Sequence, residues 1–269
     1  MRNKIIVSEK EFRQNQTEEL GPAVQPYYVQ LYESIGEEEE SLGSGFLLEY
    51  AGVNYVFTAG HVAVSTIGKV YGPRNKFEII NIGSTTPPFG FHTEGVRNFT
   101  DKDSAIIPIS VEAAKIIKEE HRFYCPSPVE FTHVNYPGRQ FLVSGASFKS
   151  TKKNWNSNDI EAELQNIRTM EVTDTIYEKL KLDKAEFIVV KFERDKMFSS
   201  KKDKRIYLKS LNGMSGSPIW VIMNKLTGMI TIDNLKICGI LAYYHESEKV
   251  LIGNRINILK PILDAFNES

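Results

Sequence analysis

Three polar residues in this chain could together carry out nucleophilic acyl transfer. A serine hydroxyl is a poor nucleophile at neutral pH, so it needs a base within hydrogen-bond reach, and that base needs a third group to orient it. We therefore predict that Ser215 is the nucleophile, His61 the general base and later acid, and Asp103 the orienting group. Their local motifs are Gly213-Met214-Ser215-Gly216-Ser217-Pro218, Thr58-Ala59-Gly60-His61 and Asp103-Ser104-Ala105.

The choice of aspartate depends on the residues that follow it. Asp101 lies two residues before Asp103, in the polar stretch 100–103. Such a stretch alone is typical of a solvated turn. Asp103 is preferred because an apolar, strand-like run over residues 105–109 follows it. Each of the three motifs is weak evidence alone, since short segments rich in glycine and serine are common in turns. Their joint occurrence indicates a catalytic triad.

The three motifs resemble those of the trypsin-like, chymotrypsin-fold serine peptidases. The order His61, Asp103, Ser215 is the one that these enzymes use. The resemblance is strong at the motifs and extends loosely over residues 27–266. An α/β-hydrolase is disfavoured, because its Gly-x-Ser-x-Gly motif needs a glycine where Ser217 stands. In that fold the histidine and the acid also follow the serine.

The resemblance implies roles for the residues around the nucleophile. The backbone N–H groups of Gly213 and Ser215 would form the oxyanion hole, where losing one donor typically costs about 3–4 kcal/mol of transition-state stabilisation. Ser217 replaces the second glycine of the commoner Gly-x-Ser-Gly-Gly-Pro motif. Because serine is small, we expect the turn to tolerate it.

The resemblance also implies a substrate-binding set, formed by Lys209, Ala242, Tyr243 and Tyr244. Lys209, six residues before Ser215, takes the position at the base of the pocket for the P1 side chain. A lysine there argues against trypsin-like specificity and favours an acidic P1 residue if it points into the pocket. The alternative, that Lys209 faces solvent, stays open. Residues 242–244 match the strand along which a substrate backbone pairs.

Activation is expected to differ from that of digestive and clotting enzymes of the family. In those enzymes a new N-terminal amine pairs with an aspartate directly before the nucleophile, because a buried charge needs a partner. Here Met214 stands at that position, and the sequence has no Ile-Val-Gly-Gly segment. The site thus resembles bacterial stress-response and viral members. We expect activity without N-terminal cleavage, or control by a protein partner or by loop ordering.

Composition excludes several classes of function. The 269 residues include 33 basic and 34 acidic side chains, for a net charge of −1, which gives no indication of nucleic-acid or membrane partners. No Cys/His spacing suggests a zinc site, and the predicted chemistry requires no cofactor or metal. The first ten residues lack the apolar run of a signal peptide, and no segment approaches the ~20 apolar residues of a membrane span. We predict a short cytoplasmic, prokaryotic-type member of the family.

Cysteine usage agrees with a reducing compartment. Only Cys125 and Cys238 occur, far apart in the sequence. Secreted trypsin-like enzymes usually carry several disulfides, whereas a cytoplasmic protein needs none. We predict two buried free thiols; a bridge between them is the alternative.

Short strand-like segments separated by turn signals favour a β-barrel or sandwich over a doubly wound sheet. Such segments lie at residues 28–32, 44–50, 54–58, 76–81, 105–109, 141–144, 186–192, 218–222 and 236–242. Residues 111–120 and 257–266 read as helices. Residues 151–185 read as an insertion with helical content at 160–165.

Combined with the resemblance, this pattern predicts an all-β fold. It consists of two antiparallel six-stranded β-barrels packed around a catalytic cleft, with a short C-terminal helix and a partly helical insertion. We expect residues 1–23 to form a polar extension and residues 24–120 to form the first barrel, with His61 and Asp103. Residues 121–269 would form the second barrel, with Ser215.

The predicted function is that of a serine endopeptidase that cleaves protein substrates through an acyl-enzyme. A non-catalytic peptide-binding module on the same fold is the alternative, and the presence of all three triad residues argues against it. A processing protease dedicated to one partner in a cytosolic signalling or defence pathway is a narrower version of the first reading. The expected partners are a protein or peptide substrate and, as a further option, an activating protein.

Overall fold

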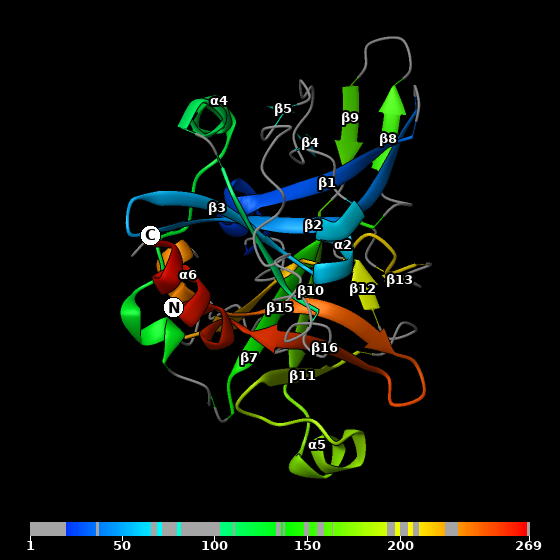
Figure 1. Ribbon diagram of the computed structural model, residues 1–269. Helices are drawn as coiled ribbons and strands as arrows, with labels where there is room; N and C mark the ends of the chain where they lie inside the picture. Colours follow the sequence, from blue (N-terminus) through cyan, green and yellow to red (C-terminus); the bar gives the residue numbers. More distant parts are fainter. Residues whose placement is uncertain are drawn as a thin grey trace, which may run out of the picture.

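The computed structural model is mostly strand, with few and short helices (Figure 1). Two antiparallel sheets of six strands each dominate it, which confirms the predicted fold class. The structure describes residues 20–35, 38–65, 69–71, 80–81, 103–109, 111–132, 136, 138–147, 151–154, 159–162, 164–192, 197–199, 204–206, 210–223 and 231–267.

The first sheet comes from the N-terminal part of the chain. Its spatial order is β5-β4-β1-β2-β3-β6. Its strands are β1 (Tyr28–Ile35), β2 (Glu38–Tyr50), β3 (Val53–Thr58), β4 (Lys69–Tyr71), β5 (Ile80–Asn81) and β6 (Ala105–Pro108). A two-residue turn with positive φ at both Ala51 and Gly52 joins β2 to β3, and this geometry matches the twist of a tight hairpin. Of the strand predicted at 76–81, residues 76–79 lie outside the described residues.

The second sheet comes from the C-terminal part and has the order β10-β7-β14-β15-β16-β11. Its strands are β7 (Gln140–Gly145), β10 (Gln165–Met170), β11 (Phe187–Lys191), β14 (Pro218–Ile222), β15 (Leu235–His245) and β16 (Val250–Arg255). An antiparallel bridge between Glu171 and Val190 joins its two outer strands. The second sheet therefore closes into a barrel.

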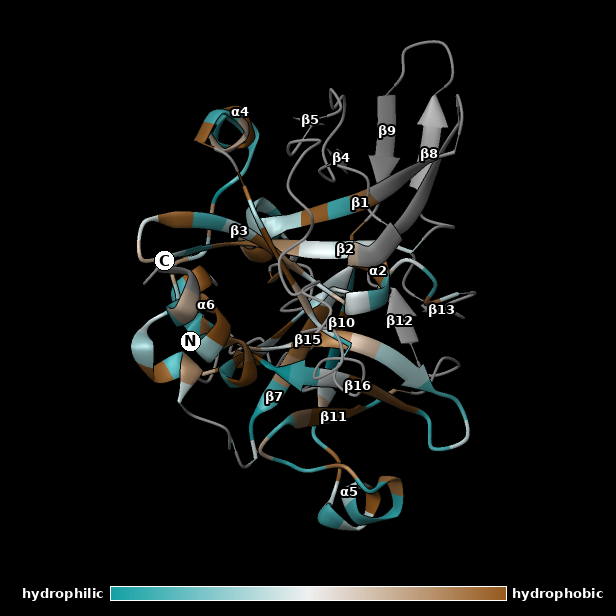
Figure 2. Cartoon of the chain, in the orientation of Figure 1, coloured by the Kyte–Doolittle hydropathy of each residue, from teal (hydrophilic) through white to brown (hydrophobic). Residues whose placement is uncertain are grey.

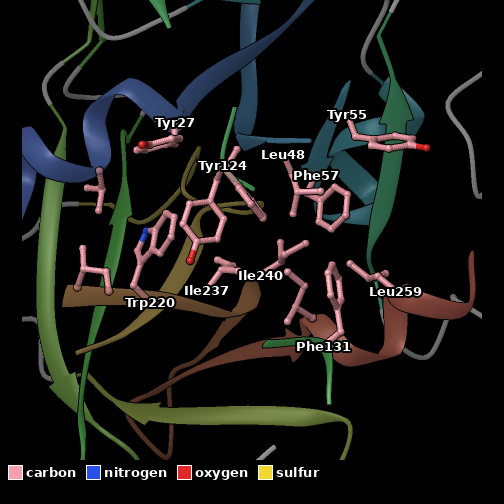
Figure 3. Packing of buried hydrophobic residues seen from close by; sticks show 14 of the residues in the cluster. Tyr27, Leu48, Tyr55, Phe57, Tyr124, Phe131, Trp220, Ile237, Ile240 and Leu259 are labelled. Carbon is pink, nitrogen blue, oxygen red and sulfur yellow. The ribbon is translucent and has the colours of Figure 1, made fainter. Parts of the chain in front are cut away.

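Both sheets bury their facing sides in one aromatic core (Figure 3). Trp220 from β14 is fully buried, and its ring meets Tyr124 at 5.1 Å and Phe46 from β2 at 6.2 Å between centroids. Such edge contacts contribute ~0.5–1.5 kcal/mol each beyond the buried area. Hydrophobic residues concentrate along the strands of both sheets (Figure 2). The shared core thus fixes one sheet against the other.

The core also includes residues before the first strand. Residues 20–24 form a helical turn, and η1 (Gln25–Tyr27) follows it. Leu20 and Val24 are buried in the aromatic core. Packing therefore begins before residue 24, where the first barrel was expected to start, because these two apolar side chains reach the core.

The insertion at 151–185 is partly helical, but not where the sequence indicated. Residues 160–162 and 165 lie in strands: β8 (Thr151–Asn154) and β9 (Asp159–Ala162) pair as a hairpin, and β10 begins at Gln165. The expected helix there is wrong, because strand pairing overrides the helical spacing of Ile160 and Leu164. The helix of this region is instead α5 (Asp174–Leu180).

The remaining elements are short. They are α2 (Gly60–Ser65), α4 (Val111–Glu120), η2 (Pro128–Phe131), β12 (Met197–Ser199), β13 (Lys204–Ile206), η5 (Ile232–Asn234), η6 (Ile256–Leu259) and α6 (Lys260–Asn267). The helices predicted at 111–120 and near the C-terminus are confirmed as α4 and α6. Among the described residues, no helix combines the length and apolar character needed to cross a membrane.

Both cysteines are free thiols, as predicted. Cys238 is buried, but Cys125 is exposed, so the prediction of burial is wrong for Cys125. Cys125 follows Tyr124, whose backbone forms a parallel bridge with Leu48 of β2. At Cys125 the chain has left that pairing and runs at the surface.

A buried ion pair supports the closed side of the second barrel. The guanidinium of Arg255 is only 3% exposed and donates to Glu171 Oε1 at 2.9 Å. Tyr177 from α5 donates to the same carboxylate oxygen at 2.7 Å. The Nε of Arg255 donates to the carbonyl of Phe187 at 2.9 Å. A buried charge with this many partners becomes costly when one partner is removed.

We expect Glu171→Ala to lower the free energy of unfolding by about 3–5 kcal/mol, because it leaves the buried guanidinium unpaired. Urea denaturation measures this change. Glu178→Ala, at an exposed position of α5, is the matched control and should change stability by less than about 0.5 kcal/mol. Equal effects of the two substitutions would contradict the role of the ion pair.

Candidate active site

His61 and Asp103 form a directly bonded pair at one edge of the first sheet. β3 and β6 are antiparallel neighbours with Thr58 opposite Ala105, so the end of β3 and the start of β6 meet at this edge. His61 Nδ1 lies 2.7 Å from Asp103 Oδ2. The backbone N–H of His61 donates to the other carboxylate oxygen at 2.8 Å. One carboxylate thus fixes both the ring and the main chain of His61.

This pair is accessible and locally strained. The His61 side chain is 53% exposed and that of Asp103 is 27% exposed. Asp103 has a φ of +40°, a left-handed conformation that costs an L-residue roughly 1–2 kcal/mol. Such strain persists only where surrounding contacts hold it and is common at functional sites. Here the two hydrogen bonds to His61 are part of that support.

Ser215 lies in the second of two consecutive tight turns that share Met214, and residues 211–217 are called the serine turn below. The N–H of Met214 donates to Leu211 O, and the N–H of Ser217 to Met214 O, both at 2.9 Å. Gly213 and Gly216, the third residues of these turns, have φ values of +96° and +89°. A type II turn requires a positive φ at this place, which favours glycine. The Met214 side chain is fully buried in the core of the second barrel, so it anchors the turn while Ser215 stays half-buried.

Among the described residues, two backbone donors of the serine turn have no backbone acceptor. The N–H groups of Met214, Gly216 and Ser217 are all used within the fold. In the described part of the chain, those of Gly213 and Ser215 donate to no backbone carbonyl. Two such donors in one rigid turn suit an oxygen that carries negative charge.

The serine turn packs against the first sheet close to His61. The N–H of Ser44 in β2 donates to Ser215 O at 2.7 Å. Gly43 touches both sides of the site, because a Cβ built there would lie 2.9 Å from Ser215 O and 2.5 Å from the side chain of Val62. Val62 is the neighbour of His61 in α2. The structure therefore brings Ser215, His61 and Asp103 to the same edge.

The residues expected to bind substrate are described in part. Lys209 lies outside the described residues. Ala242, Tyr243 and Tyr244 lie in β15, which accepts a hydrogen bond from the serine turn, Gly216 N–H to Leu241 O, at 2.7 Å. Ala242 stands at a bulge and is buried, so its side chain faces inward.

The two tyrosines differ in their surroundings. Tyr243 is 45% exposed, and its pKa is raised by partial burial and by the negative charge of Asp103. The Tyr244 ring packs edge-on against Phe192 at 5.5 Å. Tyr243 is thus the accessible aromatic side chain of the predicted set.

Two polar residues that support the site were not predicted. Ser44 contacts the serine turn, and its only sequence signal is the small-residue run Gly43-Ser44-Gly45 at the start of the strand expected at residues 44–50. Asn254 is buried in β16 and donates to Ser104 Oγ at 2.8 Å. It thereby ties the second barrel to the residue after Asp103. An asparagine within the apolar strand 250–255 was the available signal.

Comparisons with known proteins support the fold alone. Neither a protein-family model nor a curated protein sequence matches this chain. Among solved structures, "Structure of GrC", which is granzyme C, a chymotrypsin-fold serine protease, matches with a TM-score of 0.52 at 14% sequence identity. The match covers 92% of this chain and 96% of that chain. The chain has a chymotrypsin-like double β-barrel fold. The double β-barrel accounts for the wide spacing of His61, Asp103 and Ser215, since the first two lie at the first sheet and the third beside the second.

We expect Gly216→Ala to destabilise the protein by about 3 kcal/mol or more. The added Cβ would lie 1.8 Å from Ser44 O and 2.3 Å from Thr58 Oγ1, which adds overpacking to the cost of a positive φ. Gly52→Ala is the matched control, because Gly52 has a φ of +82° but no atom within 4 Å of the added Cβ. We expect a cost of about 1–2 kcal/mol there. Thermal and urea unfolding measure both, and similar losses would argue against the close contact.

Proposed function

We propose that this protein is a serine endopeptidase. The observation that carries the proposal is the His61–Asp103 pair at the edge where the serine turn packs. Asp103 orients His61 through Nδ1, so Nε2 is the nitrogen that exchanges protons with Ser215 Oγ. The N–H groups of Gly213 and Ser215 are the donors for the oxyanion. The fold shared with a serine protease supports this assignment at the level of architecture.

The reaction takes two acyl-transfer steps. Ser215 Oγ attacks the peptide carbonyl carbon while His61 Nε2 takes its proton, and the carbonyl oxygen becomes an anion held by the two N–H groups. The C–N bond then breaks, and His61 gives the proton to the leaving amine. A water molecule next attacks the acyl ester with His61 as base. The acid product leaves, and the proton returns to Ser215.

An extended peptide is the substrate that suits β15. Its backbone would pair along residues 242–244 by adding a strand, with the exposed Tyr243 available to contact it. Lys209 is proposed as the base of the P1 pocket, which favours an acidic P1 residue; a preference for apolar P1 residues would favour a solvent-facing Lys209. A dedicated processing role in the cytoplasm also stays a prediction, with which two free thiols are compatible.

The first test is labelling by a fluorophosphonate probe. We expect stoichiometric labelling of the natural protein and none of Ser215→Ala or His61→Ala, because nucleophile and base act as a unit. Asp103→Asn should slow labelling by about 10⁴-fold at most, since it favours the wrong tautomer of His61. Rates are measured by quantifying the labelled chain over time.

A second serine–histidine contact supplies the control. Ser247 Oγ lies 3.4 Å from His245 Nδ1 at the exposed end of β15. Ser247→Ala and His245→Ala should leave labelling unchanged. Absence of labelling in folded natural protein would contradict the proposal and favour the non-catalytic peptide-binding module.

Because methionine stands directly before the nucleophile at position 214, we expect that activity does not depend on a new N-terminus. Its position, fully buried among apolar side chains, offers no carboxylate to which an N-terminal ammonium could bind, and a buried unpaired charge is costly. We expect a chain that lacks residues 1–19 to react with the probe at the same rate as the full chain. A gain of labelling of tenfold or more on truncation would show that the N-terminal segment controls the site.

A further inference from the structure

A chain of buried hydroxyl groups ends at the serine turn. The N–H of Ala146 donates to the hydroxyl oxygen of Tyr28 at 2.9 Å. The Tyr28 hydroxyl lies 2.8 Å from Ser44 Oγ. Ser44 Oγ in turn donates to the carbonyl of Gly213 at 2.7 Å. Tyr28 and Ser44 are both completely buried, so water does not compete for these groups.

The hydrogen bonds on either side of the Tyr28–Ser44 contact have a definite direction. Each hydroxyl has one proton, and that of Ser44 goes to Gly213 O. The Tyr28 oxygen accepts the N–H of Ala146. The Tyr28 proton is shared between two acceptors, Gln30 Oε1, to which the hydroxyl donates, and the neighbouring Ser44 Oγ. Burial raises the pKa of Tyr28, so the phenol keeps its proton.

The chain crosses between the two halves of the molecule. Ala146 follows β7 and Gly213 belongs to the serine turn, both in the C-terminal half, whereas Tyr28 and Ser44 lie in β1 and β2. Ser44 also donates its backbone N–H to Ser215 O. One residue therefore holds the carbonyls on both sides of the Met214–Ser215 peptide, the peptide that carries the N–H of Ser215.

We propose that Tyr28 and Ser44 are positioning residues for the oxyanion hole. Through Gly213 O they fix the peptide planes of the serine turn, so that the N–H groups of Gly213 and Ser215 keep a common orientation before substrate arrives. Preorganised donors are effective because no reorganisation occurs during the reaction. The inference rests on the proposed function, since it assigns these residues to the same reaction.

The two hydroxyls connect backbone groups that apolar side chains could not serve. Phenylalanine at position 28 and alanine at position 44 would fill nearly the same space but leave the N–H of Ala146 and the carbonyl of Gly213 without these partners. The hydroxyls thus form a connected network that reaches the serine turn. The network ends on the carbonyl of Gly213, which belongs to the serine turn.

The test compares Tyr28→Phe and Ser44→Ala with a matched control, Tyr177→Phe. Tyr177 is also a buried tyrosine whose oxygen accepts a backbone N–H, that of Val189 at 2.8 Å, and whose proton goes to a side chain. It packs in a different cluster, beside α5. Each of the three substitutions removes only a hydroxyl, and Ser44→Ala keeps the backbone bond to Ser215.

The first readout is the fluorophosphonate labelling rate. We expect a decrease on the order of tenfold for Tyr28→Phe and a hundredfold for Ser44→Ala, within the 10²–10³ that loss of one oxyanion donor costs. Tyr177→Phe should keep the natural rate, whatever its effect on thermal stability. If Tyr28→Phe and Ser44→Ala keep that rate as well, the inference is wrong.

The second readout, amide hydrogen exchange, does not depend on activity. We expect exchange of the Met214, Gly216 and Ser217 amides to become at least tenfold faster in Tyr28→Phe and Ser44→Ala, but not in Tyr177→Phe. If the natural protein is not labelled and exchange still changes in this pattern, the proposed function fails while the hold on the turn stands. Faster exchange with unchanged labelling would reduce the network to a structural role and overturn the inference.

Discussion

The close contact between the serine turn and β2 is the constraint on which the site depends. A main-chain bond from Ser44 to Ser215 joins the C-terminal half to the first sheet, and Gly216 allows it because a side chain there would overlap Ser44 O. β2 in turn pairs with β3, which leads into α2 and His61. The position of Ser215 relative to His61 is therefore set by backbone hydrogen bonds rather than by flexible side chains.

The shared aromatic core makes this contact rigid. Trp220 lies in β14 of the second sheet, yet its ring packs directly against Phe46 of the first sheet. Close-packed interiors deform little, so the two sheets cannot slide without breaking these ring contacts. Closure of the second barrel at Glu171 and Val190 removes its free edge. The strain at Asp103 can persist in such a frame because the surrounding packing holds it.

Local chemistry explains what could be predicted from the sequence. The serine turn, the residues after β3 and the start of β6 each have a local backbone requirement, and these requirements leave motifs. The strands β10 and β16 were not indicated, because β10 alternates weakly, with Ile167 as its one buried residue, and β16 reads as a short run interrupted by Gly253 and Asn254. The helical spacing of Ile160 and Leu164 was misleading, since that segment pairs with its neighbour as a hairpin.

Long-range polar contacts could not be predicted, and they also bear on how the turn is controlled. Ser44 and Gly213 are 169 residues apart, so no local pattern links them. In the zymogen scheme an ion pair orders the turn, and it forms only after a chain cleavage. Here the side chain of Met214 is buried among apolar residues, and the neutral hydroxyl groups of Tyr28 and Ser44 lie behind the turn. Neutral groups are much cheaper to bury than charges. The turn can therefore be ordered as the chain folds, without later insertion of a charged N-terminus.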